Sequence, residues 1–114
     1  KNTFKAGKTI TNPPNKQSIC DALLADIPGE LTYLRNNKLA TNVLMVSDDE
    51  VNDAMRFAFQ FLKMVVEPGG SVALAAALSQ KIDFENKVSV VVLSGGNVDM
   101  SLYDEIQREG GSSI

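Results

Sequence analysis

The stretch that decides the fold is Lys87-Val88-Ser89-Val90-Val91-Val92-Leu93, which is followed directly by Ser94-Gly95-Gly96-Asn97. Its nearly continuous apolar run is typical of a strand buried on both faces, as in a parallel sheet. The glycine pair predicts a tight turn, and Asp99–Arg108 has the pattern of a last helix that ends near Gly110. A strand, a glycine turn and a helix in this order favour an α/β fold with a parallel sheet.

The middle of the chain repeats this succession of strand and helix. Asn42–Val46 predicts a short buried strand, and Ser47 followed three residues later by Glu50 predicts a helix N-terminus with a capping box. The segment Glu67-Pro68-Gly69-Gly70-Ser71 is expected to break this helix, and an alanine-rich second helix is expected through Val72–Gln80. The first helix shows an apolar face with a spacing of three and four residues, made by Val51, Ala54, Met55, Ala58, Phe59, Leu62, Val65 and Val66.

The N-terminal part of the chain is polar and rich in turn residues. Lys1–Gln17 contains Asn12-Pro13-Pro14-Asn15, where the proline pair forbids a regular helix, so residues 1–17 are interpreted as a loop or linker. A short extended piece is expected near Lys8–Thr11. Ser18–Ala25 predicts a short helix or turn, and Glu30–Asn36 predicts a helix after a Pro-Gly pair.

Composition excludes several classes of function. The chain has 114 residues, enough for one small domain, and a net charge of −3, whereas a protein that binds nucleic acid through its phosphates needs a basic surplus. No apolar run reaches the ~18 residues of a membrane span. The single cysteine excludes an internal disulfide and favours a reducing, cytoplasmic location. The absence of histidine removes Ser–His–Asp catalysis and histidine-containing zinc sites.

Two glycine-containing segments are candidate ligand sites. Ser94-Gly95-Gly96-Asn97 follows a predicted strand, and ligands of open α/β sheets bind at the carboxyl ends of the strands. The same residues also suit a plain strand-to-helix turn. Glu67 places a carboxylate beside Pro68-Gly69-Gly70, where it could face a ligand, although the segment also suits a simple break between helices.

The two segments together resemble a known family. Val66-Glu67-Pro68-Gly69-Gly70-Ser71-Val72-Ala73-Leu74-Ala75-Ala76 and Val90-Val91-Val92-Leu93-Ser94-Gly95-Gly96-Asn97-Val98-Asp99 are similar to the C-terminal part of the serine/threonine dehydratase and serine racemase family. These are pyridoxal-phosphate enzymes of the tryptophan-synthase-β-like fold. Pro28-Gly29-Glu30-Leu31-Thr32 and Val46-Ser47-Asp48-Asp49-Glu50 also match, in the family's order. The resemblance implies that residues 18–114 are the C-terminal part of the parallel-sheet large domain.

The resemblance also implies roles for individual residues. Ser94 is expected to hydrogen-bond the pyridine nitrogen of pyridoxal 5'-phosphate, Gly95 and Gly96 to line the ring edge, and Glu67 to lie near the cofactor end of the pocket. A neutral hydroxyl partner does not hold a full positive charge on the ring nitrogen, and this suits β-elimination. In the racemase branch an ATP effector contacts a lysine and an asparagine that match Lys63 and Asn97. Lys63 taken alone also fits an ordinary solvated helix lysine.

One family segment departs from its usual form. Ser18-Ile19-Cys20-Asp21-Ala22 has cysteine and alanine where the family pattern Ser/Thr-Ile-Ala-Asp-Gly has alanine and glycine, which puts the role of Asp21 in doubt. Cys20 is expected to be a small buried hydrophobe.

The family's remaining machinery has no match in this sequence. The lysine that carries the cofactor, the glycine-rich phosphate loop and the ligands of a divalent cation all lie upstream in the family, and Lys5 matches a non-catalytic segment, so no catalytic residue and no metal ligand are assigned. The resemblance implies a C-terminal fragment of a homo-oligomeric threonine/serine dehydratase that gives a 2-oxo acid and ammonia from a hydroxyamino acid. The alternatives are a serine racemase, another hydroxyamino-acid dehydratase, or a non-catalytic assembly piece. We expect the chain to need the missing N-terminal part, or a partner, to fold well.

Overall fold

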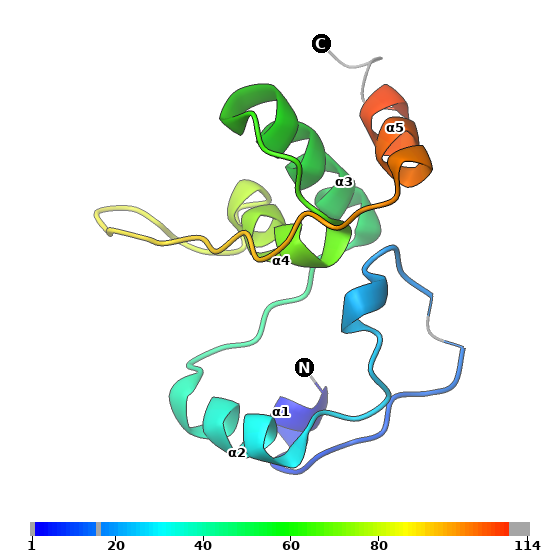
Figure 1. Ribbon diagram of the computed structural model, residues 1–114. Coiled ribbons are helices and arrows are strands. Elements are labelled where there is room, and N and C mark those ends of the chain that lie inside the picture. Colours follow the sequence, from blue (N-terminus) through cyan, green and yellow to red (C-terminus); the bar gives the residue numbers. More distant parts are fainter. Residues whose placement is uncertain (1, 16, 110–114) are drawn as a thin grey trace.

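The computed structural model describes residues 2–15 and 17–109. Its helices form two groups in Figure 1, with α3 (Asp48–Phe57), α4 (Pro68–Leu78) and α5 (Met100–Glu109) in the upper group. The lower group contains α1 (Asn2–Ala6) and α2 (Glu30–Leu39). None of the helices in the described part of the chain combines the length and apolar character that crossing a bilayer requires.

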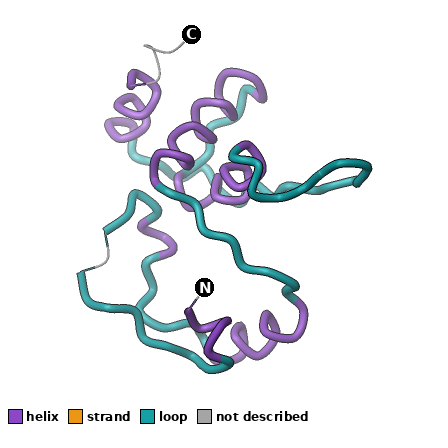
Figure 2. The backbone as a smooth tube through the Cα atoms, turned by 180° about the vertical axis from the view of Figure 1, so that it is seen from behind, coloured by secondary structure: helices purple, strands orange, loops and turns teal. Residues whose placement is uncertain are grey.

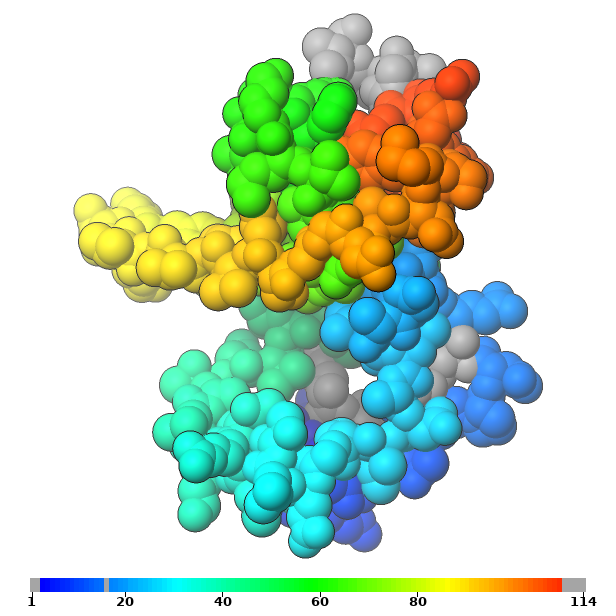
Figure 3. All heavy atoms as spheres, in the orientation of Figure 1, coloured from blue at the N-terminus to red at the C-terminus, as the bar shows by residue number. Residues whose placement is uncertain are grey.

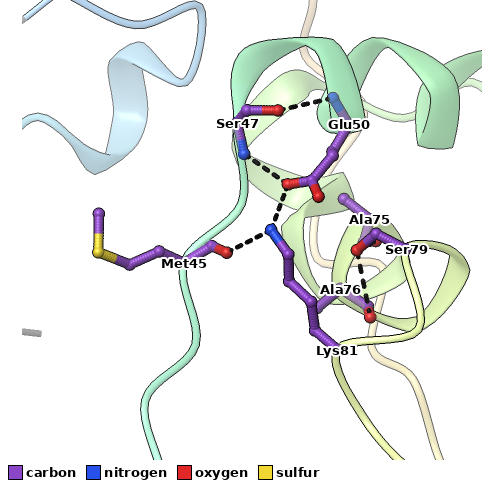
Figure 4. Close-up of polar contacts among 7 residues, drawn as sticks. All are labelled: Met45, Ser47, Glu50, Ala75, Ala76, Ser79 and Lys81. Carbon is purple, nitrogen blue, oxygen red and sulfur yellow. Dashed lines mark hydrogen bonds and ion pairs between the residues drawn. The ribbon is translucent and has the colours of Figure 1, made fainter.

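The N-terminus of α3 is built by the predicted capping box. The Ser47 amide donates to the Glu50 carboxylate at 2.7 Å, and the Glu50 amide donates to the Ser47 hydroxyl at 3.2 Å. Figure 4 shows that the same carboxylate also receives the ammonium group of Lys81 at 2.5 Å. Because a backbone amide and a distant lysine meet at this carboxylate, the start of α3 is tied to the segment that follows α4.

The core lies between α3, α4 and α5. Met55 and Ala54 on α3 have no exposed surface, and the predicted apolar face of this helix is confirmed at those positions. Arg56 joins α3 to α5, because its guanidinium donates to the Ile106 carbonyl at 2.9 Å. The buried apolar residues of this core are Cys20, Val51, Ala54, Met55, Ala58, Val66, Leu74, Ala75, Tyr103 and Ile106.

The prediction that one helix runs as far as Val66 is wrong. α3 passes at Ala58 into a single π-helical turn, η2 (Ala58–Leu62), and the chain leaves it through Lys63, whose φ of 58° is left-handed. A left-handed residue ends a helix because the next amide no longer points along the axis. Val65 therefore lies outside the helix and is 52% exposed, whereas Val66 is buried in the core.

The second helix begins earlier than the sequence pattern suggested. Pro68 is the first residue of α4, so Pro68-Gly69-Gly70-Ser71 forms the first turn of a helix and is not a break. Proline suits this position because the first helical amides have no partner within the helix. Ser71 is fully buried, and its hydroxyl donates to the Pro68 carbonyl at 3.0 Å.

The two predicted strands are absent from the described residues. Asn42–Val46 and Lys87–Leu93 are loop segments, as Figure 2 shows. Lys87–Leu93 lies within residues 82–93, here called the arm. The outer part of the arm projects away from the rest of the molecule in Figure 3. Val88 is fully exposed and Val90 is 87% exposed, so the expected burial on both faces is wrong for this chain. The physical reason is that a strand needs a neighbouring strand for its backbone hydrogen bonds, and the described residues supply none.

The lower group departs from the predicted loop at its start. Residues 2–6 form α1, whereas residues 7–15 follow the loop prediction without a strand. A short 3-10 helix, η1 (Asp21–Leu23), confirms the turn expected within Ser18–Ala25. α2 confirms the helix expected from Glu30, but it has no buried residue and its Leu31 is 80% exposed. The last helix, α5, is confirmed, while its expected end near Gly110 lies outside the described residues.

Candidate functional site

The two glycine segments singled out in the sequence lie against each other. The Glu67 amide donates to the Gly95 carbonyl at 3.0 Å, and the Ser94 amide donates to the Gly70 carbonyl at 3.4 Å. The first turn of α4 is therefore joined through its backbone to the turn at the end of the arm, which we call the serine turn (Ser94–Asn97).

Close backbone packing explains two of the glycines. A Cβ atom on Gly70 would lie 2.8 Å from the Gly95 carbonyl oxygen, and a Cβ atom on Gly96 would lie 2.7 Å from the Val65 carbonyl oxygen. Both distances are too short for real side chains, so only glycine allows the serine turn to approach α4 so closely. The turn is thus held against this segment by close contacts between backbone atoms.

Glu67 lies at the N-cap of α4, with its carboxylate over the serine turn. The Asn97 amide donates to Oε2 of Glu67 at 3.1 Å. Glu67 is half-buried. No lysine or arginine of the described chain pairs with it, so its contacts are to the turn itself.

Ser94 presents a hydroxyl group that the fold itself does not use. Its side chain is exposed, and within the described part of the chain only its amide takes part in a hydrogen bond. An exposed hydroxyl on a turn whose neighbours are two glycines can both donate and accept a hydrogen bond. The structure thus leaves this group available to a ligand or to another part of a larger fold.

A groove of about 350 Å³ opens beside the serine turn. Asn97 and Asp99 line it from the turn side, Pro68 from the start of α4, and Ser18 and Asp21 from the segment before η1. Polar atoms dominate its wall. The segment around Asp21, which differs from the family pattern, and the serine turn thus line the same groove, although the two are far apart in the sequence.

A carboxylate on α3 positions the Ser18 side of this groove. The Ser18 hydroxyl and the Ile19 amide donate to the two oxygens of Asp48, at 2.6 Å and 3.2 Å. Sequence reasoning missed this pair, because an aspartate in a first helical turn is already explained by the helix dipole. Next to it, Cys20 is buried as expected, and burial raises the pKa of its thiol.

Lys63 is not joined to Asn97 by any hydrogen bond in the described part of the chain. Its side chain is exposed, and its ammonium group donates to the Gln60 carbonyl at 2.8 Å, within the turn that ends η2. The described residues contain no group of three or more carboxylate, cysteine or histidine side chains that could hold a metal ion. The structure therefore brings Glu67, Gly95 and Asn97 together, with Ser94 at the edge of the cluster.

Comparisons with known proteins show what the chain as a whole is similar to. The family model described as "Pyridoxal-phosphate dependent enzyme" matches residues 1–95. The chain is 35% identical over 106 residues to the catabolic L-threonine dehydratase of Escherichia coli K12, covering 91% of this chain and 32% of that protein. It is 39% identical over 110 residues to the serine racemase of Arabidopsis thaliana, covering 90% of this chain and 32% of that protein.

Solved structures show the same likeness in three dimensions. The structure of maize serine racemase superposes with a TM-score of 0.79 at 34% identity, covering 95% of this chain and 35% of that chain. The T.th. threonine deaminase gives a TM-score of 0.78 at 29% identity, covering 87% of this chain and 33% of that chain. The chain spans only about a third of the length of these relatives. With the family model matching most of its residues, the chain belongs to the family of pyridoxal-phosphate dependent enzymes.

Proposed function

We propose that this chain forms the part of a pyridoxal 5'-phosphate site that contacts the edge of the cofactor ring, in a serine/threonine ammonia-lyase. The remaining part of the fold would come from a longer polypeptide or a second one, and we call the assembled protein the complete enzyme. The observation that carries the proposal is the unpartnered hydroxyl of Ser94, exposed on a glycine turn that is fixed against the start of α4 within the described part of the chain.

The residues present fit the cofactor. The ring nitrogen of pyridoxal phosphate needs a hydrogen-bond partner, and the Ser94 hydroxyl can supply one. Gly95 and Gly96 carry no side chain that would stand between a flat ring and the exposed Ser94 hydroxyl. Asp21 and Asp99 line the neighbouring groove, and Ser94 is not among its lining residues. The resemblance supports the same assignment for Ser94, Gly95 and Gly96.

The Ser94 hydroxyl would act by donating a hydrogen bond to an unprotonated ring nitrogen. When bound, pyridoxal phosphate supplies the electron-withdrawing ring that weakens bonds at the α-carbon of an amino acid. A hydroxyl partner keeps this withdrawal moderate, because it does not stabilise a full positive charge on the ring nitrogen as a carboxylate would. Moderate withdrawal favours loss of the β-hydroxyl group, and the net reaction gives a 2-oxo acid and ammonia.

The complete enzyme would also finish the sheet. The likeness to maize serine racemase and to threonine deaminase supports an α/β fold in which Lys87–Leu93 is a parallel strand between partners from the remaining part. The resemblance further supports a divalent cation in that remaining part, a homo-oligomer, and an effector contact at Lys63 and Asn97.

Serine racemisation is a second candidate function. It is favoured by the 39% identity to the Arabidopsis serine racemase and by the structural likeness to the maize protein. The two activities share the contacts to the cofactor ring. Racemisation returns a proton to the opposite face of the α-carbon, whereas the lyase reaction expels the β-hydroxyl group and leaves the α-carbon as the carbonyl of the 2-oxo acid. Which outcome follows depends on groups outside this chain.

The test is an assay of the complete enzyme with pyridoxal phosphate and L-serine or L-threonine. We expect a 2-oxo acid and ammonia in equal amounts. D-serine as the main product would replace the lyase proposal with the racemase, and the absence of bound cofactor would contradict both. Assay of this chain alone serves as the control and is expected to show no turnover.

A further inference from the structure

We propose that Glu67 is a positioning residue, which holds the serine turn in place and does not touch the cofactor. This inference rests on the proposed function, because it concerns how Ser94 is presented to the ring. It departs from the expectation, drawn from the family resemblance, that Glu67 faces the cofactor end of the pocket.

Glu67 forms two hydrogen bonds with the serine turn. Its amide donates to the Gly95 carbonyl at 3.0 Å, and its carboxylate accepts the Asn97 amide at 3.1 Å. These two bonds lie on either side of Gly96, so one residue at the start of α4 fixes the middle and the end of the turn. Hydrogen bonds to an ionised acceptor are stronger than neutral ones, and this one replaces a bond that the irregular backbone cannot make with itself.

The carboxylate also occupies the space above Gly95. A Cβ atom added to Gly95 would lie 2.8 Å from Cδ of Glu67, which is too close for two carbon atoms. Glycine at this position therefore makes room for the Glu67 side chain. The conflict is with a protein side chain and requires no ligand to explain it.

Ser94 depends on this clamp through the chain itself. It precedes Gly95 directly, and the hydrogen bond that its amide donates to the Gly70 carbonyl is long, at 3.4 Å. Without the Glu67 contacts, this hydrogen bond alone would hold Ser94, and the hydroxyl would move with the turn. The Glu67 contacts at Gly95 and Asn97 limit this movement, and a shift of about 1 Å is enough to weaken a hydrogen bond to a ring nitrogen.

The first experiment compares Glu67→Gln with Glu67→Ala in the complete enzyme. The glutamine amide oxygen still accepts from the Asn97 amide, whereas alanine cannot. We expect Glu67→Ala to speed hydrogen exchange at the Asn97 amide about tenfold or more and to weaken pyridoxal phosphate binding by about threefold, no more than the loss of the Ser94 hydroxyl would, and Glu67→Gln to restore most of both.

A direct role at the cofactor predicts a different result. Glu67→Gln would then change the absorbance maximum of the bound cofactor as much as Glu67→Ala does, with unchanged exchange at Asn97. That result would overturn the inference. If the wild-type enzyme binds no pyridoxal phosphate, the proposed function fails, but the exchange rates at Asn97 in the two variants still decide whether Glu67 clamps the turn.

The second experiment is a double-mutant cycle with Gly95→Ala. In the presence of Glu67 the added methyl group should displace the carboxylate from the Asn97 amide, so we expect about a threefold loss of cofactor affinity. In the Glu67→Ala background the same substitution should cost much less. Equal losses in both backgrounds would show that Gly95 makes room for something other than Glu67 and would overturn the inference.

Discussion

The helical body of α3, α4 and α5 and the arm differ in how their apolar residues are covered. Met55 in the body is fully buried, whereas Val90 in the arm is 87% exposed. Helices satisfy their backbone hydrogen bonds within themselves and need only one face covered, and α3, α4 and α5 bury a shared core within the described chain. A strand inside a sheet needs a partner on each side, and the described residues leave the arm without one. The comparison teaches that the serine turn lies between a region with a buried core and a segment that lacks strand partners among the described residues.

The largest expected effect is on the body. Met55→Ala in the complete enzyme should lower the free energy of unfolding by about 2–5 kcal/mol, because it leaves a cavity where no atom is exposed. The measurement is urea unfolding followed by circular dichroism. The control is Met100→Ala, at a methionine that is 77% exposed and should have little effect. Equal losses for both variants would show that the body does not hold the buried core described above.

A smaller effect is expected on the arm, and it should depend on the rest of the protein. In this chain alone the amides of Val88, Val90 and Val92 should exchange with solvent like those of an unfolded peptide. In the complete enzyme they should slow by about a hundredfold, because they become bonded within the sheet. The amides of Met55 and Ala54 are the internal reference. Arm amides that stay fast in the complete enzyme would contradict the proposed strand.

The smallest effect concerns the link between the arm's base and α3. The hydrogen bond from Lys81 lowers the pKa of Glu50 below its ordinary value of 4.5. A depressed pKa stabilises the fold above that ordinary value, and this contribution is lost as the pH falls through the lower value of the folded state. The melting temperature of the complete enzyme should therefore exceed that of Glu50→Gln at neutral pH, and the gap should close in acid.

The matched control for this pH series is Glu85→Gln, at an exposed glutamate within the arm. For this variant, the difference in melting temperature from the wild type should not shrink comparably between neutral and acidic pH. A constant gap for Glu50→Gln across the series would mean that the Lys81 contact does not couple the two segments.

Local signals in the sequence predicted the parts of the fold that depend on local chemistry. Ser47 and Glu50 lie three residues apart and form their capping box without help from the rest of the chain. α4 starts earlier than the sequence predicts, because Pro-Gly-Gly usually ends a helix, whereas a proline at the first helical position starts one. The left-handed turn at Lys63 carries no signal in its residue type, since glycine normally takes that role.

Non-local features could not be predicted in the same way. The apolar run at Lys87–Leu93 does predict a strand, but a run of valines does not state where its partners come from. At the site, the family resemblance assigned residues of both glycine segments to one cofactor pocket, whereas the contact between Glu67 and Asn97 could not be foreseen. It depends on how α4 and the serine turn pack, which the spacing of residues along the chain does not fix.

The most direct test of the cofactor assignment is the dissociation constant of pyridoxal phosphate for the complete enzyme and its Ser94→Ala variant. Loss of one hydrogen bond to the ring should weaken binding about three- to tenfold. Ser101→Ala, at an exposed serine on α5, should leave the constant unchanged. Equal constants for the wild type and Ser94→Ala would contradict the placement of the ring nitrogen at the serine turn.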